Sequence, residues 1–362
     1  MADDGSIDIV GAYAYRLVGN YYNSDMFVNL LDQPQIDFSQ PWWPGNYTEV
    51  ATIGSRQFAA QGNIDPSFYD RTYTLVFNKK IAADSKIDNL YDLVNSGKWT
   101  IDKMEEVAKQ ATADLNGDTK FDTNDQYGYL SGVNMVMDAF NNSFELSFAK
   151  FDDNGTPQLT GLTEKITDAC TRMKEFIRGS GHVFYNPKLQ DAEIAKMFQE
   201  GKGLLTGMAL LDMHTLRSME VDFGILPYPK WDEAQESYLT YSAGTDAAAA
   251  YAIPANADAE LGACLLEALA YYGYSDIWPE YFERALKGKN ARDNESAEIL
   301  EMIFDNIYFD FTQIYSYVFG NQKAPSMLMR MTIKDDKDIA SAYAADEEIY
   351  KSTMEKLLSA LK

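Results

Sequence analysis

The chain is poor in the residue types and motifs that most often carry enzyme chemistry. Its 362 residues include only two cysteines and two histidines, so neither a disulfide framework nor a histidine-based metal centre is expected. No apolar run is long enough to span a membrane as a helix. The sequence also lacks G-x-S-x-G, G-x-x-x-x-G-K-[ST] and G-x-G-x-x-G. The usual signatures for a serine nucleophile and for nucleotide binding are therefore missing.

Positive charge is also scarce. The chain has 31 Lys and Arg against 55 Asp and Glu, which gives a net charge of −24. A surface of this sign repels phosphate, so nucleic acid is not an expected partner. The composition fits a protein that handles neutral or cationic ligands. Its length and 46% hydrophobic content are sufficient for two domains with cores of their own.

The two cysteines, Cys170 and Cys264, each lie on the apolar stripe of a predicted helix. Such stripes face the core of a folded protein. The sequence therefore predicts two buried free thiols. A single bridge between them is the alternative, because sequence alone gives no distance.

One stretch, Asp114–Gly128, has the spacing of a calcium-binding loop. Its sequence is D-L-N-G-D-T-K-F-D-T-N-D-Q-Y-G. It departs from the usual pattern at Thr119, where glycine is common, and at its last ligand, which is Asp rather than Glu. The sequence predicts a structural Ca²⁺ site, with a solvated acidic turn as the alternative. The candidate ligands, the fourth through its backbone carbonyl, are Asp114, Asn116, Asp118, Lys120, Asp122 and Asp125.

Aromatic residues make up 13% of the chain, with 24 Tyr and 5 Trp. Aromatic rings cover the flat C–H faces of sugars, and polar side chains bind the hydroxyl groups. Rings in loops and at strand ends are the strongest candidates for ligand contacts, because binding residues concentrate there. The alternative for each ring is a place in the core or on the surface. The candidates are Tyr13, Tyr15, Trp42, Trp43, Tyr73, Trp231 and Tyr241.

Strand-like and helix-like segments alternate along the chain, which predicts an α/β fold. Several segments also follow one another in a distinctive order: G-S-I-D-I-V-G-A-Y-A-Y, I-D-F-S-Q-P-W-W, T-L-V-F-N-K-K, L-V-N-S-G-K-W-T-I-D-K-M, the acidic loop, F-G-I-L-P-Y-P-K-W-D-E-A-Q and L-K-G-K-N-A-R-D-N-E-S-A-E-I-L. Together they cover Ser6 to Phe311. In this order they resemble bacterial extracellular solute-binding proteins of family 1, the carbohydrate-type binding proteins of ABC importers.

The resemblance implies a two-lobe fold of the periplasmic-binding-protein type, with a ligand cleft between the lobes. It assigns residues 1–78 plus 245–310 to the first lobe and 79–244 plus 311–362 to the second. Family members have a strand, a helix and another strand before the segment that matches Ile7–Val10. We therefore expect the first lobe to lack its initial βαβ unit. A signal peptide and a lipoprotein cysteine are expected to be missing with it.

The resemblance further implies a non-enzymatic protein that binds a sugar or oligosaccharide and delivers it to the permease subunits of an ABC importer. It implies an extracellular location, with a lipid anchor on the full-length protein. By the same layout, the acidic loop braces the second lobe away from the cleft. The alternatives are a binding protein for a peptide or a cationic solute, a glycoside hydrolase, and a calcium-dependent adhesion module.

Overall fold

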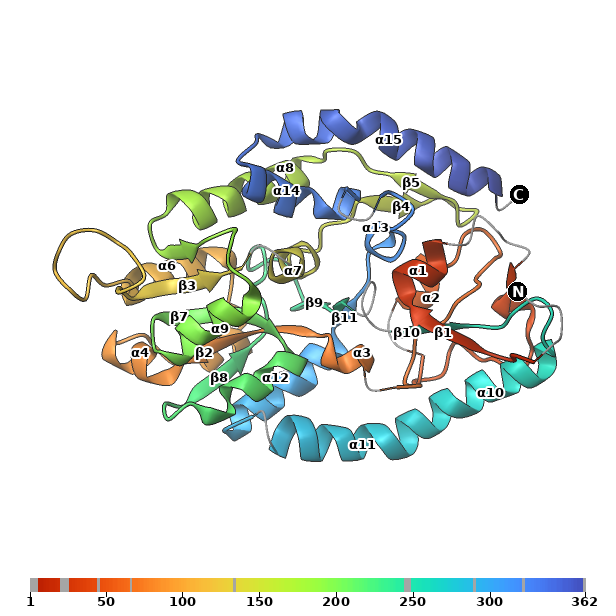
Figure 1. Ribbon diagram of the computed structural model, residues 1–362, viewed down its shortest axis with the longest axis horizontal. Helices are drawn as coiled ribbons and strands as arrows, with labels where there is room; N and C mark the ends of the chain where they lie inside the picture. Colours follow the sequence, from red (N-terminus) through yellow and green to blue (C-terminus); the bar gives the residue numbers. More distant parts are fainter. Residues whose placement is uncertain are drawn as a thin grey trace.

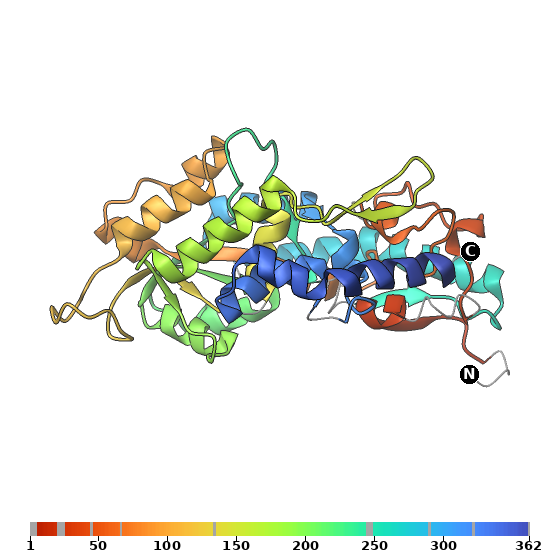
Figure 2. The ribbon, with the colours of Figure 1, turned by 90° about the horizontal axis from the view of Figure 1, so that it is seen from above.

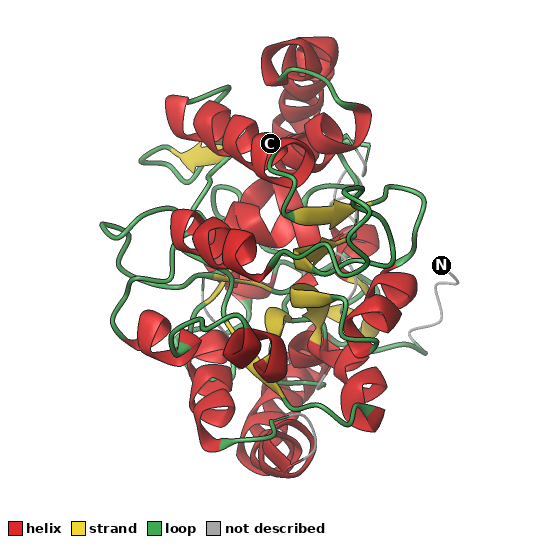
Figure 3. Ribbon diagram, turned by 90° about the vertical axis from the view of Figure 1, so that its left-hand side faces the viewer, coloured by secondary structure: helices red, strands yellow, loops and turns green. Residues whose placement is uncertain are grey.

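The structure, a computed structural model, describes residues 6–19, 26–43, 46–65, 67–132, 135–243, 249–288, 291–320 and 323–360. These residues form a mixed α/β arrangement with two lobes (Figure 1). Viewed along the long axis, most strands lie inside a shell of helices (Figure 3). The predicted α/β class is confirmed. None of the helices within these residues has the length and the apolar character that crossing a membrane requires.

The larger lobe is built on a five-stranded sheet. Strand β2 is antiparallel to both of its neighbours, β7 and β8, whereas β3 is parallel to both β6 and β7. All six residues of β2, Y-T-L-V-F-N, are buried, as expected for a strand with helices on both faces of its sheet. In spatial order the strands are β6 (Val183–Tyr185), β3 (Tyr127–Ser131), β7 (Gly203–Ala209), β2 (Tyr73–Asn78) and β8 (Phe223–Leu226).

Two of the longer helices of this lobe start at threonine caps. The hydroxyl of Thr100 accepts the Lys103 N–H at 3.3 Å, and that of Thr163 accepts the Ile166 N–H at 3.2 Å. Such caps pair amide groups that the first turn of a helix leaves unpaired. The helices around the sheet are α4 (Lys79–Asp84), α5 (Leu90–Asn95), α6 (Ile101–Ala111), α7 (Met135–Ser143), α8 (Glu164–Lys174), α9 (Asp191–Gln199), α12 (Asn294–Asp305) and α14 (Leu328–Asp335). The 3-10 helix η4 (Leu210–Ser218) and the π-helix η3 (Glu175–Gly179) complete this lobe.

The smaller lobe has a two-stranded sheet in which β1 (Val10–Tyr13) is antiparallel to β10 (Ala249–Ala252). Its core contains large aromatic residues, among them Tyr47, Phe68, Phe309 and Tyr315. The other elements here are α1 (Ala14–Gly19), η2 (Leu30–Asp32), α2 (Tyr47–Ala51), the hairpin of β4 (Ala149–Phe151) and β5 (Pro157–Leu159), α10 (Ala259–Tyr272), α13 (Phe311–Ile314) and η8 (Pro325–Met327).

Three segments that join the lobes lie side by side and form the hinge. The first follows α3 (Ser67–Asp70) and pairs through Thr72 with Ser242. The second, β9 (Thr240–Tyr241), is parallel to the third, β11 (Ile307–Tyr308). The Ala243 N–H also donates to the Arg71 carbonyl at 2.9 Å. Backbone hydrogen bonds therefore link all three crossings.

Two long helical stretches also extend over both lobes. The first turns of α15 (Ile339–Ala360) bury Ile339 in the core of the larger lobe, and its later turns bury Tyr350 and Leu357 in the core of the smaller one. Figure 2 shows this helix running lengthwise over the molecule. Along the opposite edge in Figure 1, α10 continues into η6 (Gly273–Ile277), α11 (Trp278–Tyr281) and η7 (Phe282–Lys287).

The packing differs from the predicted lobe boundaries in several places. The predicted division gives 73–78 to the first lobe, but β2 lies inside the larger sheet, between β7 and β8. It also gives 294–305 to the first lobe, whereas α12 packs on that sheet and shares its core. Conversely, the end of α15 belongs to the core of the smaller lobe. The chain passes from one lobe to the other at each crossing. Where one lobe ends and the next begins therefore depends on long-range packing rather than on local sequence.

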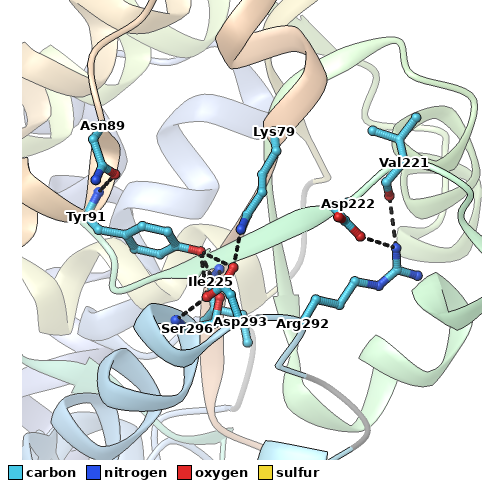
Figure 4. A network of polar contacts seen from close by, with 9 residues as sticks. All are labelled: Lys79, Asn89, Tyr91, Val221, Asp222, Ile225, Arg292, Asp293 and Ser296. Atoms are coloured by element: carbon cyan, nitrogen blue, oxygen red, sulfur yellow. Dashed lines mark hydrogen bonds and ion pairs between the residues drawn. The ribbon is translucent and has the colours of Figure 1, made fainter.

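A polar network ties α12 to the larger sheet (Figure 4). The Asp293 carboxylate pairs with Lys79, accepts the Tyr91 hydroxyl at 3.0 Å and caps α12 by accepting the Ser296 N–H at 2.6 Å. Next to it, Arg292 donates to the Val221 carbonyl at 3.0 Å. Burial opposes the charged form of Asp293, but the ion pair and these hydrogen bonds outweigh it and hold its pKa below its usual range.

The two cysteines are both free, and only one is buried. Cys170 lies in the core of the larger lobe, as predicted. The prediction is wrong for Cys264, which is exposed on α10. That helix packs inward through a stripe of small residues and Leu266, so the stripe that carries Cys264 faces outward.

Candidate functional site

The strongest candidate site lies where the larger sheet meets the hinge. Tyr73 is the first residue of β2, Tyr241 is in the hinge strand β9, and their ring centroids are 5.5 Å apart. Tyr73 lines a cavity of about 100 Å³ together with side chains from β7, α7, α9 and η4. Polar and apolar groups are mixed in its wall, which includes Val136, Asp191, Thr206, Met208, Asp212 and Thr215.

Two glycines allow this arrangement. A Cβ on Gly207 would overlap the Tyr228 hydroxyl, and one on Gly132 would overlap the Asp191 carboxylate. Each position therefore needs glycine because another group approaches the backbone closely, not because of a left-handed backbone. The Asp191 carboxylate lies against the backbone at Gly132, next to the end of β3.

The cavity wall carries negative charge close to buried hydroxyl groups. Asp191 is the first residue of α9, which starts with a capping box formed by Gln190 and Glu193. Burial raises the pKa of the Tyr228 hydroxyl well above its usual range, and the Asp191 charge adds to this effect. Tyr228 therefore stays protonated at neutral pH. The site offers carboxylates as acceptors and neutral hydroxyls that both donate and accept.

A buried ion pair supports the elements around the site. The Arg330 Nε of α14 donates to the Asp138 Oδ1 of α7 at 3.0 Å, and both side chains are buried. Beside it, Asn142 and Gln313 exchange amide hydrogen bonds, and Asn142 also donates to the Tyr308 carbonyl at 2.7 Å. These contacts fix α7, which contributes Val136 to the cavity, against the hinge.

A second cavity, of about 480 Å³, lies between α2, the β4–β5 hairpin and the hinge strand β11. Several of its polar residues are used within the fold. Asn46 exchanges two hydrogen bonds of 2.9 Å with the backbone of Phe309. The buried carboxylate of Asp310 accepts the Phe148 and Thr312 N–H groups. The cavity beside Tyr73 is taken as the candidate site because a predicted ligand-binding ring lines it.

Trp42 and Trp43 form a different cluster, in the smaller lobe against α10. Their indole N–H groups both donate to the Glu267 carboxylate, each at 3.0 Å. Trp43 is only 5% exposed, and the Trp42 ring meets the edge of Tyr271 at 5.2 Å between centroids. The two tryptophans are therefore separate from the Tyr73–Tyr241 pair.

The remaining predicted contacts are dispersed. Tyr13 ends β1, is half exposed, and has the Arg16 guanidinium 5.9 Å from its ring. Trp231 is partly buried against Phe144 at 5.3 Å between ring centroids. Tyr15 lies in α1, and its side chain is outside the described part of the chain. The ligand contacts assigned to these aromatics stay predictions.

In the acidic loop, the candidate calcium ligands accept hydrogen bonds from the loop's own backbone. Asp114 accepts the Gly117 and Thr119 N–H groups, and Asp125, which is fully buried, accepts those of Leu115 and Asp122. Asn116 accepts the N–H of Asp118, Asp118 accepts that of Lys120, and Asp122 accepts that of Asn124. Thr119 has a φ of +65°, the left-handed conformation for which glycine is usual at this loop position.

The loop projects from the outer end of the larger lobe, away from the hinge (Figures 1 and 2). This agrees with the predicted position far from a cleft. Over the ranges described above, no group of three or more His, Cys, Asp or Glu side chains is arranged to hold a metal ion. Since backbone amides already bind the carboxylate oxygens, calcium binding stays a prediction here.

Sequence reasoning missed the side chains that share the cavity with Tyr73. Asp191 resembles any acidic residue in the first turn of a helix, where the helix dipole favours it. Thr206 and Met208 lie in a buried strand, and Asp212 lies in a 3-10 helix. No local pattern distinguishes them, because only the pairing of β7 with β2 brings them next to Tyr73.

Comparison with solved structures identifies the architecture. The sugar-binding protein MalE from Xanthomonas citri matches with a TM-score of 0.67 and 12% identity, over 99% of this chain and 85% of that chain. A family 1 extracellular solute-binding protein from Bifidobacterium longum subsp. infantis matches with a TM-score of 0.62 and 13% identity, over 95% and 85%. This chain has the fold of those solute-binding proteins. No protein-family model matches the sequence, and no curated protein does.

Proteins with this solute-binding fold are not restricted to one kind of ligand. UgpB from Mycobacterium tuberculosis, solved in complex with glycerophosphocholine, matches with a TM-score of 0.63 and 13% identity, over 96% of this chain and 84% of that chain. At such identities the similarity establishes the fold and not the solute. The choice of ligand therefore depends on the residues at the site of this chain.

Proposed function

We propose that this protein binds a sugar or oligosaccharide between its two lobes and delivers it to an ABC importer without transforming it. The solute-binding fold supports this proposal, as do the sugar-binding relatives of that fold. In such a protein, binding energy selects a closed arrangement of the lobes rather than lowering a reaction barrier. Delivery implies that the protein works outside the membrane and contacts permease subunits. A lipid anchor on the full-length protein is part of the same proposal.

The observation that carries the proposal is the position of Tyr73. Its ring lies at the hinge, beside Tyr241, and lines a cavity that also contains Asp191 and Thr206. An aromatic ring next to carboxylate and hydroxyl groups matches a sugar, which has an apolar face and a rim of hydroxyls. The side chains that line this cavity belong to the larger lobe, and in the proposed function closure brings the smaller lobe against the bound ligand.

Isothermal titration calorimetry against a panel of mono- and oligosaccharides tests this function. We expect one class of saccharide to bind. Tyr73→Ala and Asp191→Asn should each reduce its binding free energy by about 2 kcal/mol, or its affinity roughly thirtyfold, as for buried anchor residues. Tyr317→Ala removes an exposed ring elsewhere and serves as the control. Thermal melts of each variant separate lost binding from lost folding. Folded variants that bind as tightly as the wild type would show that the site lies elsewhere.

A cationic solute is the second candidate, because two carboxylates, Asp191 and Asp212, line the same small cavity. Including spermidine and choline in the panel distinguishes the two functions. Heat with these cations, and none with any saccharide, would replace the sugar by a cationic ligand at the same site. Asp191→Asn and Asp212→Asn should then weaken binding more strongly than Tyr73→Ala does.

The proposal also predicts no turnover. We expect chromogenic glycosides and the best-bound saccharide to remain intact after long incubation with the protein, as checked by chromatography. Hydrolysis that disappears in Asp191→Asn would instead support a glycoside hydrolase. Hydrolysis that persists in every variant would point to a contaminating enzyme.

A further inference from the structure

Helix α10 has a second apolar stripe that no other part of the described chain covers. The helix buries Gly262, Ala263, Leu266 and Ala270 against the smaller lobe. A different set of side chains repeats at helical spacing on its outer side, and all of them are exposed. We call this set the α10 face: Leu261, Cys264, Leu265, Ala268, Leu269 and Tyr272.

The spacing of these residues, 0, 3, 4, 7, 8 and 11 along the helix, is that of a helix face which packs against a partner. Leu261, Leu265 and Leu269 are 45%, 39% and 46% exposed, and Tyr272 is 58% exposed. Scattered exposed apolar residues are ordinary, but a continuous stripe of them indicates an interaction surface. In Figure 1, α10 lies along the outer edge of the molecule.

An aromatic groove adjoins the α10 face. It has a volume of about 360 Å³ and is lined by Trp42, Glu267, Tyr271 and Tyr272, among others. Trp42 and Tyr271 form two walls that meet at an interplanar angle of 86°. Rings so arranged, next to a carboxylate, form a place for a cation, because the ring faces and the charge both attract it.

The charge around the α10 face has one sign. Residues 257–283 include six acidic residues and no Lys or Arg. Glu280 and Glu283 pair with Arg284 and Lys287. Across the described ranges no Lys or Arg pairs with Asp258, Glu260, Glu267 or Asp276. The apolar face therefore lies within a rim of uncompensated negative charge.

We propose that the α10 face binds an amphipathic α-helix of a partner protein, with an apolar side against the leucine stripe and Lys or Arg residues along its flanks. One cationic side chain of that helix enters the groove lined by Trp42, Glu267, Tyr271 and Tyr272. Complementary charge selects this occupant. A second copy of this chain would bring two acidic rims together, and anionic lipid would be repelled for the same reason.

The test uses a synthetic helical peptide of about 18 residues, or five turns, with Leu along one side and Lys and Arg along its flanks. A scrambled peptide of the same composition is the control for non-specific electrostatic binding to an acidic protein. Binding is measured by fluorescence anisotropy at about 50 mM and about 500 mM salt. We expect the patterned peptide to bind at both salt concentrations and the scrambled peptide to be released at the higher one.

Leu265→Asp and Leu269→Asp change residues that are already exposed, so the fold should persist, as checked by thermal melts. Each is expected to lower the affinity for the patterned peptide by about tenfold or more. Glu267→Gln should also lower this affinity and make it less dependent on salt. Ile349→Asp, at an exposed position of α15, is the matched control and should have no effect.

Equal binding of both peptides, or no effect of Leu265→Asp, would overturn the proposal. So would a dimer in sedimentation experiments that Leu265→Asp dissociates without any peptide binding. Saccharide titrations are independent of these measurements, so this result and the proposed transport function can fail separately.

Discussion

At the scale of single residues, Asp293 shows how one carboxylate joins distant parts of the chain. It caps α12, pairs with Lys79 and accepts the Tyr91 hydroxyl (Figure 4). Asp293→Ala removes all three interactions, and we expect it to lower the free energy of unfolding by about 2 kcal/mol. Asp293→Asn keeps a capping oxygen and should cost about 1 kcal/mol. Urea unfolding at pH 7 measures both, and equal losses would mean that the charge of Asp293, and not its cap, accounts for the stabilisation.

The same residue predicts a dependence on pH. The pKa of Asp293 is held below its usual range in the folded protein, so its ionised form stabilises the fold above the unfolded-state pKa of about 4. That contribution is lost as the pH falls through the lower, folded-state pKa. The difference in unfolding free energy between wild type and Asp293→Asn should therefore be constant near neutrality and shrink below about pH 4. A difference that grows on acidification would contradict the assigned direction.

Gly273 is a second position at which a small substitution, the addition of a Cβ atom, is expected to lower stability. A Cβ there would overlap the Asn63 carbonyl, because the helix after α10 passes directly against that backbone. We expect Gly273→Ala to cost about 3 kcal/mol, since backbone on both sides must move. Gly179, at the end of η3, has nothing within 4 Å of an added Cβ and is the matched control. Thermal denaturation of both alanine variants checks this, and similar melts would show that the helix can shift freely.

At the scale of elements, the acidic loop is expected to act as a brace. Asp114, Asp118, Asp122 and Asp125 lie within twelve residues of one another at the outer end of the larger lobe, and Ca²⁺ would offset their mutual repulsion. We expect added Ca²⁺ to raise the melting temperature, and a chelator to lower it, without changing ligand affinity. Asp118→Asn should reduce the effect, whereas Asp153→Asn, in another exposed turn, should not. A chelator that abolished ligand binding without moving the melt would contradict this role.

At the scale of the whole molecule, the hinge predicts a change of shape. The three crossings are short, and the hydrogen bonds between them can persist while the lobes rotate. We expect a bound ligand to reduce the radius of gyration in small-angle X-ray scattering. At a hundredfold excess over Kd it should add about 2.7 kcal/mol to stability. A Tyr73→Ala variant, with its affinity reduced roughly thirtyfold, should gain only about 0.9 kcal/mol at the same ligand concentration and should contract less. Stabilisation without contraction would indicate that the lobes do not move.

Much of the local structure could be predicted from the sequence. Thr100, Thr163 and Asp258 cap helices, and local sequence can predict such caps because a cap needs only residues within one turn. The stretches at 73–78, 127–131 and 203–209 are strands. Aromatic and β-branched residues favour this in the first two, whereas 203–209 is mainly a buried apolar run. The site was predicted only in part, because Tyr73 was identified without the groups on β7 and α9 that face it.

The sequence by itself determined the class of fold, the starts of helices and the position of the acidic loop, because each depends on residues close together in the chain. The tertiary structure decided which lobe each segment joins and which of two apolar stripes on α10 is buried. Gly262, Ala263 and Ala270 are less hydrophobic than the leucines on the other side. They are nevertheless the buried set, because small side chains let the helix approach Ile253 and the backbone at Asp8. Close packing depends on the partner surface, and no local pattern contains that surface.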